Sequence, residues 1–143
     1  MDELHLLGTG DAGVPMKVVA SVSPVSGNTP SITIAKVAPA SANLIDYTTF
    51  IASNMTGVNT TWTREYAFDE TYGETSFSAK TLADLIGKFR MDTTGTGTDS
   101  QAYQSHFFKG HAPIPLGPLW EGYVCSLDHP TGDGFKACVC GRK

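Results

Sequence analysis

The chain has few charged residues, and this shortage limits the kinds of protein it can be. Charged residues make up 17% of its 143 positions, against about 25% in a typical soluble domain. The ten basic residues are scattered and the formal net charge is −4, so no positive stripe is available to release counterions from phosphates. We therefore predict a protein that does not bind nucleic acid.

Long apolar runs are also missing. No stretch approaches the roughly 20 apolar residues that a bilayer crossing needs, which predicts a protein without a membrane span. Asp2 and Glu3 occupy the place where a secretory signal would be positively charged. We expect synthesis in the cytoplasm without a signal peptide.

Cysteine is scarce, with only Cys125, Cys138 and Cys140. An odd number permits at most one internal disulfide and argues against a disulfide-scaffolded secreted domain. The three thiols and His129 could form a zinc site, but Cys138 and Cys140 would lie about 7 Å apart on a strand. We predict no metal and no cofactor. Two interpretations stay open: apolar residues of a reduced interior, or a disulfide between Cys125 and one of the other two.

What recurs along the chain is a strand-and-turn signal. Residues 3–7 predict a short strand. Further strands are predicted where β-branched or aromatic residues are frequent and glycine, proline or asparagine interrupts the chain; they span 17–23, 31–37, 44–51 and 60–68. The turn residues between 17–23 and 31–37 predict a hairpin. Within 31–37, Ile32 and Ile34 alternate with Thr33 and Ala35, the period of two that turns one face inward.

One helix is predicted, at about 81–90. Thr81 could cap its first turn, with Asp84 three residues later. Apolar residues then recur at i, i+3, i+4 and i+7 and form one stripe; they are Leu82, Leu85, Ile86 and Phe89.

The C-terminal third is expected to hold loops and a hairpin. Residues 92–100 are too polar to offset their ordering entropy, so we predict a mobile loop. The proline-rich segment 111–118 should be extended. Residues 120–127 and 135–140 predict a β-hairpin.

These elements predict a mainly β fold. Seven or so short strands and one short helix at about 81–90 suggest an antiparallel β-sandwich, or a jelly-roll-like or partly open barrel. We expect one β-rich domain over residues 1–143.

No motif predicts catalysis. The glycine-rich segment Gly8–Gly13 fits a dinucleotide fingerprint, but Val14-Pro15 and a strand follow where a helix should begin. No Gly-x-Ser-x-Gly elbow is present, and the carboxylates Asp69 and Glu70 are adjacent, which suits a solvated turn. We predict that the protein is not an enzyme.

Two short segments carry family resemblances. Leu4–Pro15 resembles the opening strand and turn of metallo-β-lactamase-fold hydrolases, but that family's His-x-His-x-Asp-His cluster has no counterpart here, so no activity is carried over. Gly73-Glu74 followed by Leu82–Phe89 is similar to the segment that precedes the jelly roll in capsid proteins of picorna-like viruses. The second resemblance implies a coat protein.

Aromatic residues gather beside the proline-rich segment, and they are either core or a contact surface; they are Tyr103, Phe107, Phe108, Trp120 and Tyr123. The leading hypothesis is a structural subunit of a larger assembly, foremost a virion capsid, cement or decoration protein that binds copies of itself or other subunits. It would then reside in a virion or other extracellular particle. The alternative is a small β-sandwich module that binds carbohydrate or another ligand on Trp62, Trp120 or Tyr123.

Overall fold

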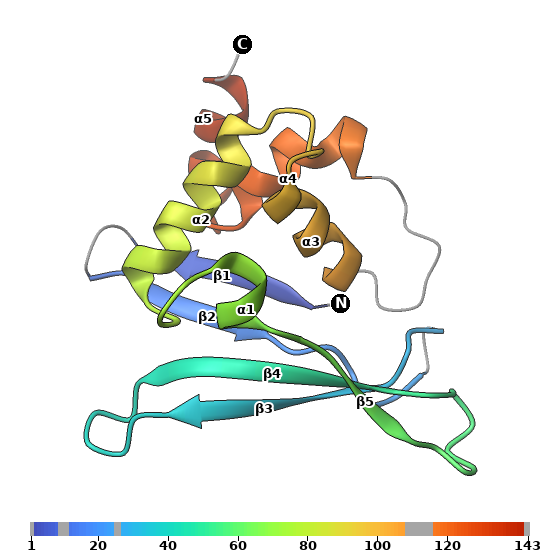
Figure 1. Cartoon of the computed structure of the whole chain (residues 1–143). Helices are drawn as coiled ribbons and strands as arrows, with labels where there is room; N and C mark the ends of the chain where they lie inside the picture. The colour runs from blue at the N-terminus through green and yellow to red at the C-terminus, as the bar shows by residue number, and fades with distance from the viewer. Residues whose placement is uncertain (1, 9–11, 25–26, 108–115, 142–143) are drawn as a thin grey trace.

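The computed structural model describes residues 2–8, 12–24, 27–107 and 116–141, and in this part of the chain strands come first and helices follow (Figure 1). The strands are β1 (Glu3–Leu7), β2 (Val14–Val18), β3 (Ser31–Val37), β4 (Leu44–Ala52) and β5 (Trp62–Ala67). The helices are α1 (Phe68–Tyr72), α2 (Ala79–Met91), α3 (Thr98–Phe107), α4 (Trp120–Ser126) and α5 (Gly132–Cys140), with a 3-10 turn, η2 (Gly117–Leu119), before α4.

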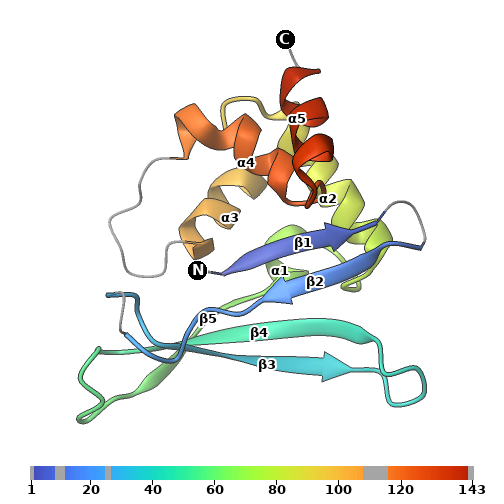
Figure 2. The same cartoon turned by 180° about the vertical axis from the view of Figure 1, so that it is seen from behind.

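The strands form two small antiparallel sheets. β1 pairs with β2, and a separate sheet has the order β3-β4-β5. In both views helices α2–α5 lie on one side of the β1–β2 ribbon and the three-stranded sheet lies on the other (Figures 1 and 2). With 38% helix, 25% strand and no closed barrel among the described residues, the prediction of a mainly β sandwich, jelly-roll-like fold or partly open barrel with one helix is wrong.

Strand positions are predicted better than strand pairing. Segments 3–7, 31–37, 44–51 and 60–68 correspond to β1, β3, β4 and β5, whereas β2 begins earlier than predicted. The hairpin predicted between 17–23 and 31–37 is wrong, because β2 pairs with β1 and β3 pairs with β4. Turn residues mark a reversal of the chain, but they do not say which strands then meet.

The glycine-rich segment Gly8–Gly13 leads into a strand. Its residues 9–11 lie outside the described part of the chain, and β2 begins directly afterwards at Val14. In the described residues after the glycines, a strand therefore occupies the place where a dinucleotide-binding motif needs a helix.

The predicted helix at 81–90 is confirmed as α2, which is slightly longer. Its N-cap is Ser78, whose Oγ accepts the Thr81 N–H at 3.2 Å while Thr81 Oγ1 accepts the Ser78 N–H at 2.8 Å. Thr81 is thus the third helical residue of a capping box and not the cap itself. The predicted stripe is buried in the core, at 0–1% exposure; it comprises Leu82, Leu85, Ile86 and Phe89.

The predicted C-terminal hairpin is wrong, because 120–126 and 132–140 are helices α4 and α5. The buried residues Trp120, Val124 and Leu127 recur with half-buried Tyr123 at i, i+3, i+4 and i+7, which is a helical period. Thr131 caps α5 by accepting the Gly134 N–H at 3.2 Å. Aromatic and β-branched content favoured strands here, but the spacing of these residues decides for helices.

The segment predicted as a mobile loop, 92–100, is held by one carboxylate. Asp92 Oδ2 accepts the Gly97 N–H at 2.7 Å, and Asp92 Oδ1 accepts the Thr94 hydroxyl at 3.0 Å. Residues 98–100 already belong to α3. A hydrogen bond from Ser100, together with those from the loop, lowers the pKa of Asp92 to about 2.

The proline-rich segment 111–118 lies mostly outside the described residues. Its last two positions, Gly117 and Pro118, form part of η2. One apolar cluster joins the inward side of β1 to the inner face of the three-stranded sheet and to α1–α4; it includes Leu4, Leu6, Tyr47, Tyr66, Phe68, Leu85, Phe89 and Trp120.

Substitution Leu85→Asp is expected to destabilise the fold strongly. It places an unpaired carboxylate where Leu85 is 0% exposed, which should cost about 3–5 kcal/mol of unfolding free energy. Urea denaturation measures this loss. The control Ala83→Asp lies on the exposed side of the same helix and should cost less than about 1 kcal/mol; equal effects would show that the stripe is not buried.

The Asp92 carboxylate should make stability depend on acid pH. Because its pKa is lowered from 3.8 to about 2 in the folded chain, its stabilising effect is present above pH 4 and is lost as pH falls toward 2. Asp92→Asn should flatten the fall in unfolding free energy between pH 4 and pH 2, measured by denaturation across that range. Asp84→Asn, an exposed residue paired with Lys80, is the control and should leave the slope nearly unchanged.

Candidate interaction surface

The aromatic residues predicted as contacts lie in the core of the folded chain. Tyr103, Phe107 and Trp120 are at most 5% exposed, and Tyr123 is half-buried. The hydroxyls of Tyr103 and Tyr123 are 2.8 Å apart, and Trp120 Nε1 donates to the carbonyl of Asp92 at 2.8 Å. Phe108 lies outside the described residues. A partner could not reach the buried rings without opening the core.

An apolar surface lies instead on the three-stranded sheet. On β3, Ser31 and Thr33 point inward: Ser31 is 2% exposed, and Thr33 Oγ1 is 3.4 Å from the hydroxyl of buried Thr49. Ile32 and Ile34 point outward and are 41% and 58% exposed. The period of two read from the sequence is confirmed, but the apolar side is the side that faces solvent.

Neighbouring strands extend this side of the sheet. Residues directly opposite in register point to the same face, and Ile32 lies opposite Phe50 on β4. At the far strand Trp62, 42% exposed, lies opposite Ala52. We define the outer apolar face as Ile32, Ile34, Phe50 and Trp62.

Charges on this side of the sheet are balanced. Lys36 is the one charged residue of β3, and it lies opposite Asp46 in register. On β5, Arg64 Nη2 lies 2.7 Å from Glu70 Oε1. The outer apolar face is therefore bordered by charges of both signs in equal number, which give it no net charge of one sign.

β3 also has an open edge within the described part of the chain. The Pro30 carbonyl accepts the Ala52 N–H at 2.9 Å on the β4 side, and the Ser31 N–H donates to the Ser21 carbonyl at 3.2 Å on the other side. Backbone groups alternate along a strand, so the N–H and C=O of Thr33 and Ala35 point away from β4. No described helix or strand lies beyond β3 in either view (Figures 1 and 2).

A groove of about 470 Å³ adjoins Trp62. Its lining combines apolar residues, such as Val22 and Met55, with the polar residues Asn54, Thr56 and Thr60. Its amide residue, Asn54, is already engaged: Oδ1 accepts from the Thr56 and Gly57 N–H groups and from two threonine hydroxyls, and Nδ2 donates to the Val58 carbonyl. The Asn54 side chain therefore has little hydrogen-bonding capacity left for a ligand in this groove.

A buried ion pair lies against the inner side of the three-stranded sheet, where it contacts Tyr66 of β5. Lys17 pairs with Asp2, and their side chains are 5% and 1% exposed. Tyr66 bridges them, because Lys17 Nζ donates to its hydroxyl at 3.0 Å and that hydroxyl donates to Asp2 Oδ2 at 3.0 Å. His106 of α3 stacks on the Tyr66 ring at 3.9 Å between centroids. Burial raises the pKa of Tyr66, so the bridging hydroxyl keeps its proton.

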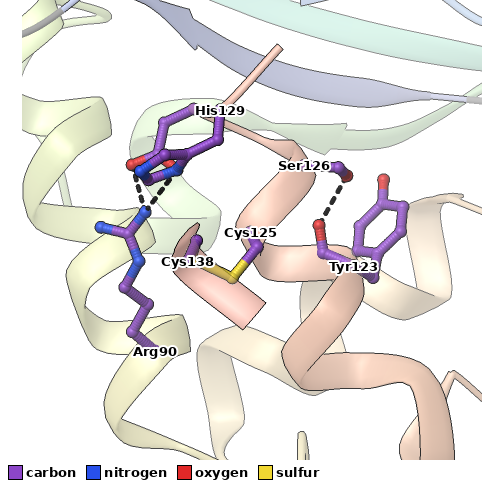
Figure 3. Close-up of a disulfide and its surroundings, with 7 residues drawn as sticks. Arg90, Tyr123, Cys125, Ser126, His129 and Cys138 are labelled. Carbon is purple, nitrogen blue, oxygen red and sulfur yellow. Dashed lines mark hydrogen bonds and ion pairs between the residues drawn. A yellow bond between two sulfur atoms is a disulfide. The ribbon is translucent and has the colours of Figure 1, made fainter. Parts of the chain in front are cut away.

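The cysteines form a disulfide between two helices. Cys125 of α4 is bonded to Cys138 of α5 (Figure 3). Cys140 is free and exposed. The disulfide interpretation is thus confirmed, although it was expected between strands. Beside it, His129 Nδ1 lies 2.6 Å from Asp128, which also pairs with Arg90. No three histidine, cysteine or acidic side chains of the described chain are arranged to hold a metal ion.

Among the described helices, none combines the length and apolar character that a membrane crossing needs. Comparison of the chain with known protein families finds no matching family, and comparison with curated proteins finds no match. The outer apolar face and the open edge of β3 are therefore the features of the described residues that bear on function.

Substitution Lys17→Met tests the buried ion pair. It removes the ammonium group that faces the buried Asp2 carboxylate, which should cost about 3–5 kcal/mol of unfolding free energy in denaturation experiments. The double variant Lys17→Met/Asp2→Asn removes the carboxylate charge as well and should recover much of that loss. Lys80→Met breaks an exposed pair with Asp84 and should change stability by about 0.5 kcal/mol or less. A single variant as stable as the parent would mean that the pair does not hold the sheets together.

Proposed function

We propose that the protein is a structural subunit that acts by binding copies of itself through the three-stranded sheet. One observation carries the proposal: β3 turns polar Ser31 and Thr33 inward, while Ile32 and Ile34 are 41% and 58% exposed on a strand with an open edge. An exposed apolar edge strand is an aggregation hazard, which native proteins avoid or cover. Covering it with a second copy removes the hazard and buries apolar area.

The charge pattern supports a like partner. Two identical surfaces repel when each carries a net charge of one sign, but here Lys36 lies opposite Asp46 and Arg64 pairs with Glu70. Only 17% of the residues in the whole chain are charged, which also limits repulsion between copies. A copy can therefore approach without a large electrostatic penalty.

The virion setting stays a prediction from the sequence. Self-association is what a capsid, cement or decoration protein would need. The capsid resemblance of Gly73-Glu74 and Leu82–Phe89 lends little support, because that segment lies here in and before α2, and two small sheets replace the jelly roll. Electron microscopy of the purified protein would detect regular particles; soluble dimers alone would argue against a shell.

Carbohydrate binding is supported less well. Of the aromatic platforms predicted, Trp120 is fully buried and Tyr123 is half-buried, which leaves Trp62 as the exposed one. Sugar recognition needs free polar groups beside the ring, and Asn54 in the adjoining groove is already occupied.

Self-association is tested by light scattering over a range of concentrations. The wild-type chain should form dimers or larger species, and Ile34→Arg should shift the midpoint of association at least tenfold toward higher concentration, about 1.4 kcal/mol, by placing two guanidinium groups at the contact.

The matched control is Met91→Arg. Met91 is 81% exposed at the end of α2, away from the sheet, and its replacement should leave association unchanged. A wild-type chain that stays monomeric at high concentration contradicts the proposal, and so does an Ile34→Arg variant that associates like the parent.

A further inference from the structure

We infer that two copies pair their β3 strands antiparallel about a twofold axis at Ile34, which joins their three-stranded sheets into one continuous sheet. This inference rests on the proposed function and specifies the partner surface and its register. Antiparallel pairing of identical strands is self-complementary, because each strand presents the same alternating donors and acceptors to the other.

The hydrogen bonds available at the edge select the positions that can pair. The backbone N–H and C=O groups of β3 that point away from β4 belong to odd-numbered residues. This follows because the Ser31 N–H is bonded on the side away from β4, whereas the Pro30 carbonyl is bonded on the β4 side. With the axis at Ile34, Thr33 lies opposite Ala35 of the second copy, and Ala35 lies opposite its Thr33. Each of these two contacts can exchange an N–H···O bond in both directions.

Neighbouring registers fit less well. An axis at Thr33 would require Ser31 as a hydrogen-bonding partner, but its N–H already donates to Ser21. An axis at Ala35 would require Val37, which follows the register irregularity between Lys36 and Val37. With the axis at Ile34, both Thr33 and Ala35 form backbone hydrogen bonds to the second copy. Neither Ser31 nor Val37 is then needed for pairing.

Side-chain packing favours the same axis. Ile34 would face Ile34 of the second copy as a non-hydrogen-bonded pair, the arrangement with the closest Cα atoms, about 4.5 Å apart. Ile32 would lie opposite the aliphatic stem of Lys36 of the second copy. The two outer apolar faces then become one continuous apolar surface on one side of the joined sheet.

Charge separation is also acceptable in this register. The two Lys36 side chains would lie four positions apart, about 13 Å along the strand direction, which exceeds the screening length of about 8 Å at physiological salt. Each lysine keeps its own Asp46 opposite in register. With the axis at Ala35 the two lysines would be only two positions apart, about 7 Å.

Cysteine cross-linking tests directly which residues of the two β3 strands lie opposite each other. In a Cys140→Ser background, which removes the exposed free thiol, Ile34→Cys is incubated with oxidised glutathione at a concentration where light scattering shows association. Two thiols and one glutathione disulfide give one intermolecular disulfide and two reduced glutathiones. The dimer band on a non-reducing gel should form about tenfold or more faster than for Met91→Cys, because association holds the two thiols together.

Further variants separate this register from others. Ile32→Cys and Lys36→Cys alone place their thiols about 13 Å apart, beyond the reach of a disulfide, and should cross-link as slowly as Met91→Cys. The double variant Ile32→Cys/Lys36→Cys should cross-link rapidly, since those positions lie opposite each other. Circular dichroism confirms that each variant is folded.

The outcomes distinguish the inference from the proposed function. Association in solution with fastest cross-linking at a position other than 34, or with no preference over Met91→Cys, overturns the register and leaves self-association standing. A chain that is monomeric by light scattering overturns both. Rapid cross-linking at 34 and in the double variant, with slow cross-linking at 32 or 36 alone, supports the register.

Discussion

The Tyr66 hydroxyl bridges the buried pair of Lys17 and Asp2, and its two hydrogen bonds connect the two sheets of this structure. Lys17 belongs to β2 and Asp2 directly precedes β1, so the ion pair itself lies within the β1–β2 ribbon. Tyr66 belongs to β5 of the other sheet, which shares no backbone ladder with the ribbon. A buried ion pair needs further hydrogen bonds to be tolerated, and here Tyr66 supplies them. The ribbon can therefore take only those positions on the sheet in which Tyr66 reaches Lys17 and Asp2.

That contact also decides which side of the three-stranded sheet is inside. Tyr66 and Tyr47 point toward Lys17, whose Nζ lies 4.9 Å from the Tyr47 ring centroid. With the aromatic side of β4 and β5 turned inward, register places Thr33 of β3 opposite Thr49 on the same side. The isoleucines of β3 are left on the other side because neighbouring residues alternate. The outer apolar face is thus a consequence of how the core is assembled.

The helices build the rest of the core and do not cover that face. Trp120, Phe89 and Tyr103 contact one another in edge or tilted arrangements between α2, α3 and α4, and the disulfide joins α4 to α5. In both views helices α2–α5 gather at one end of the molecule and β3 lies at the other (Figures 1 and 2). The helical end of the molecule is therefore well packed, while the outer apolar face of the three-stranded sheet is uncovered. This uncovered face is the basis for proposing that the sheet binds a second copy.

Local sequence patterns determined the elements whose signals are short-range. The stripe from Leu82 to Phe89 predicts α2 because residues three and four apart meet on one helix face, and β-branched and aromatic residues locate β3, β4 and β5. In α4 the same helical spacing of Trp120, Tyr123, Val124 and Leu127 was present, but strand propensity outweighed it. The candidate site was not predictable in this way: Ile32 and Ile34 were recognised as one side of a strand, and the aromatic residues chosen as contacts are core. A period of two defines two faces but not which one is covered. The tertiary structure alone decided that, because the covering groups come from β2, β5 and α3, far away in the chain.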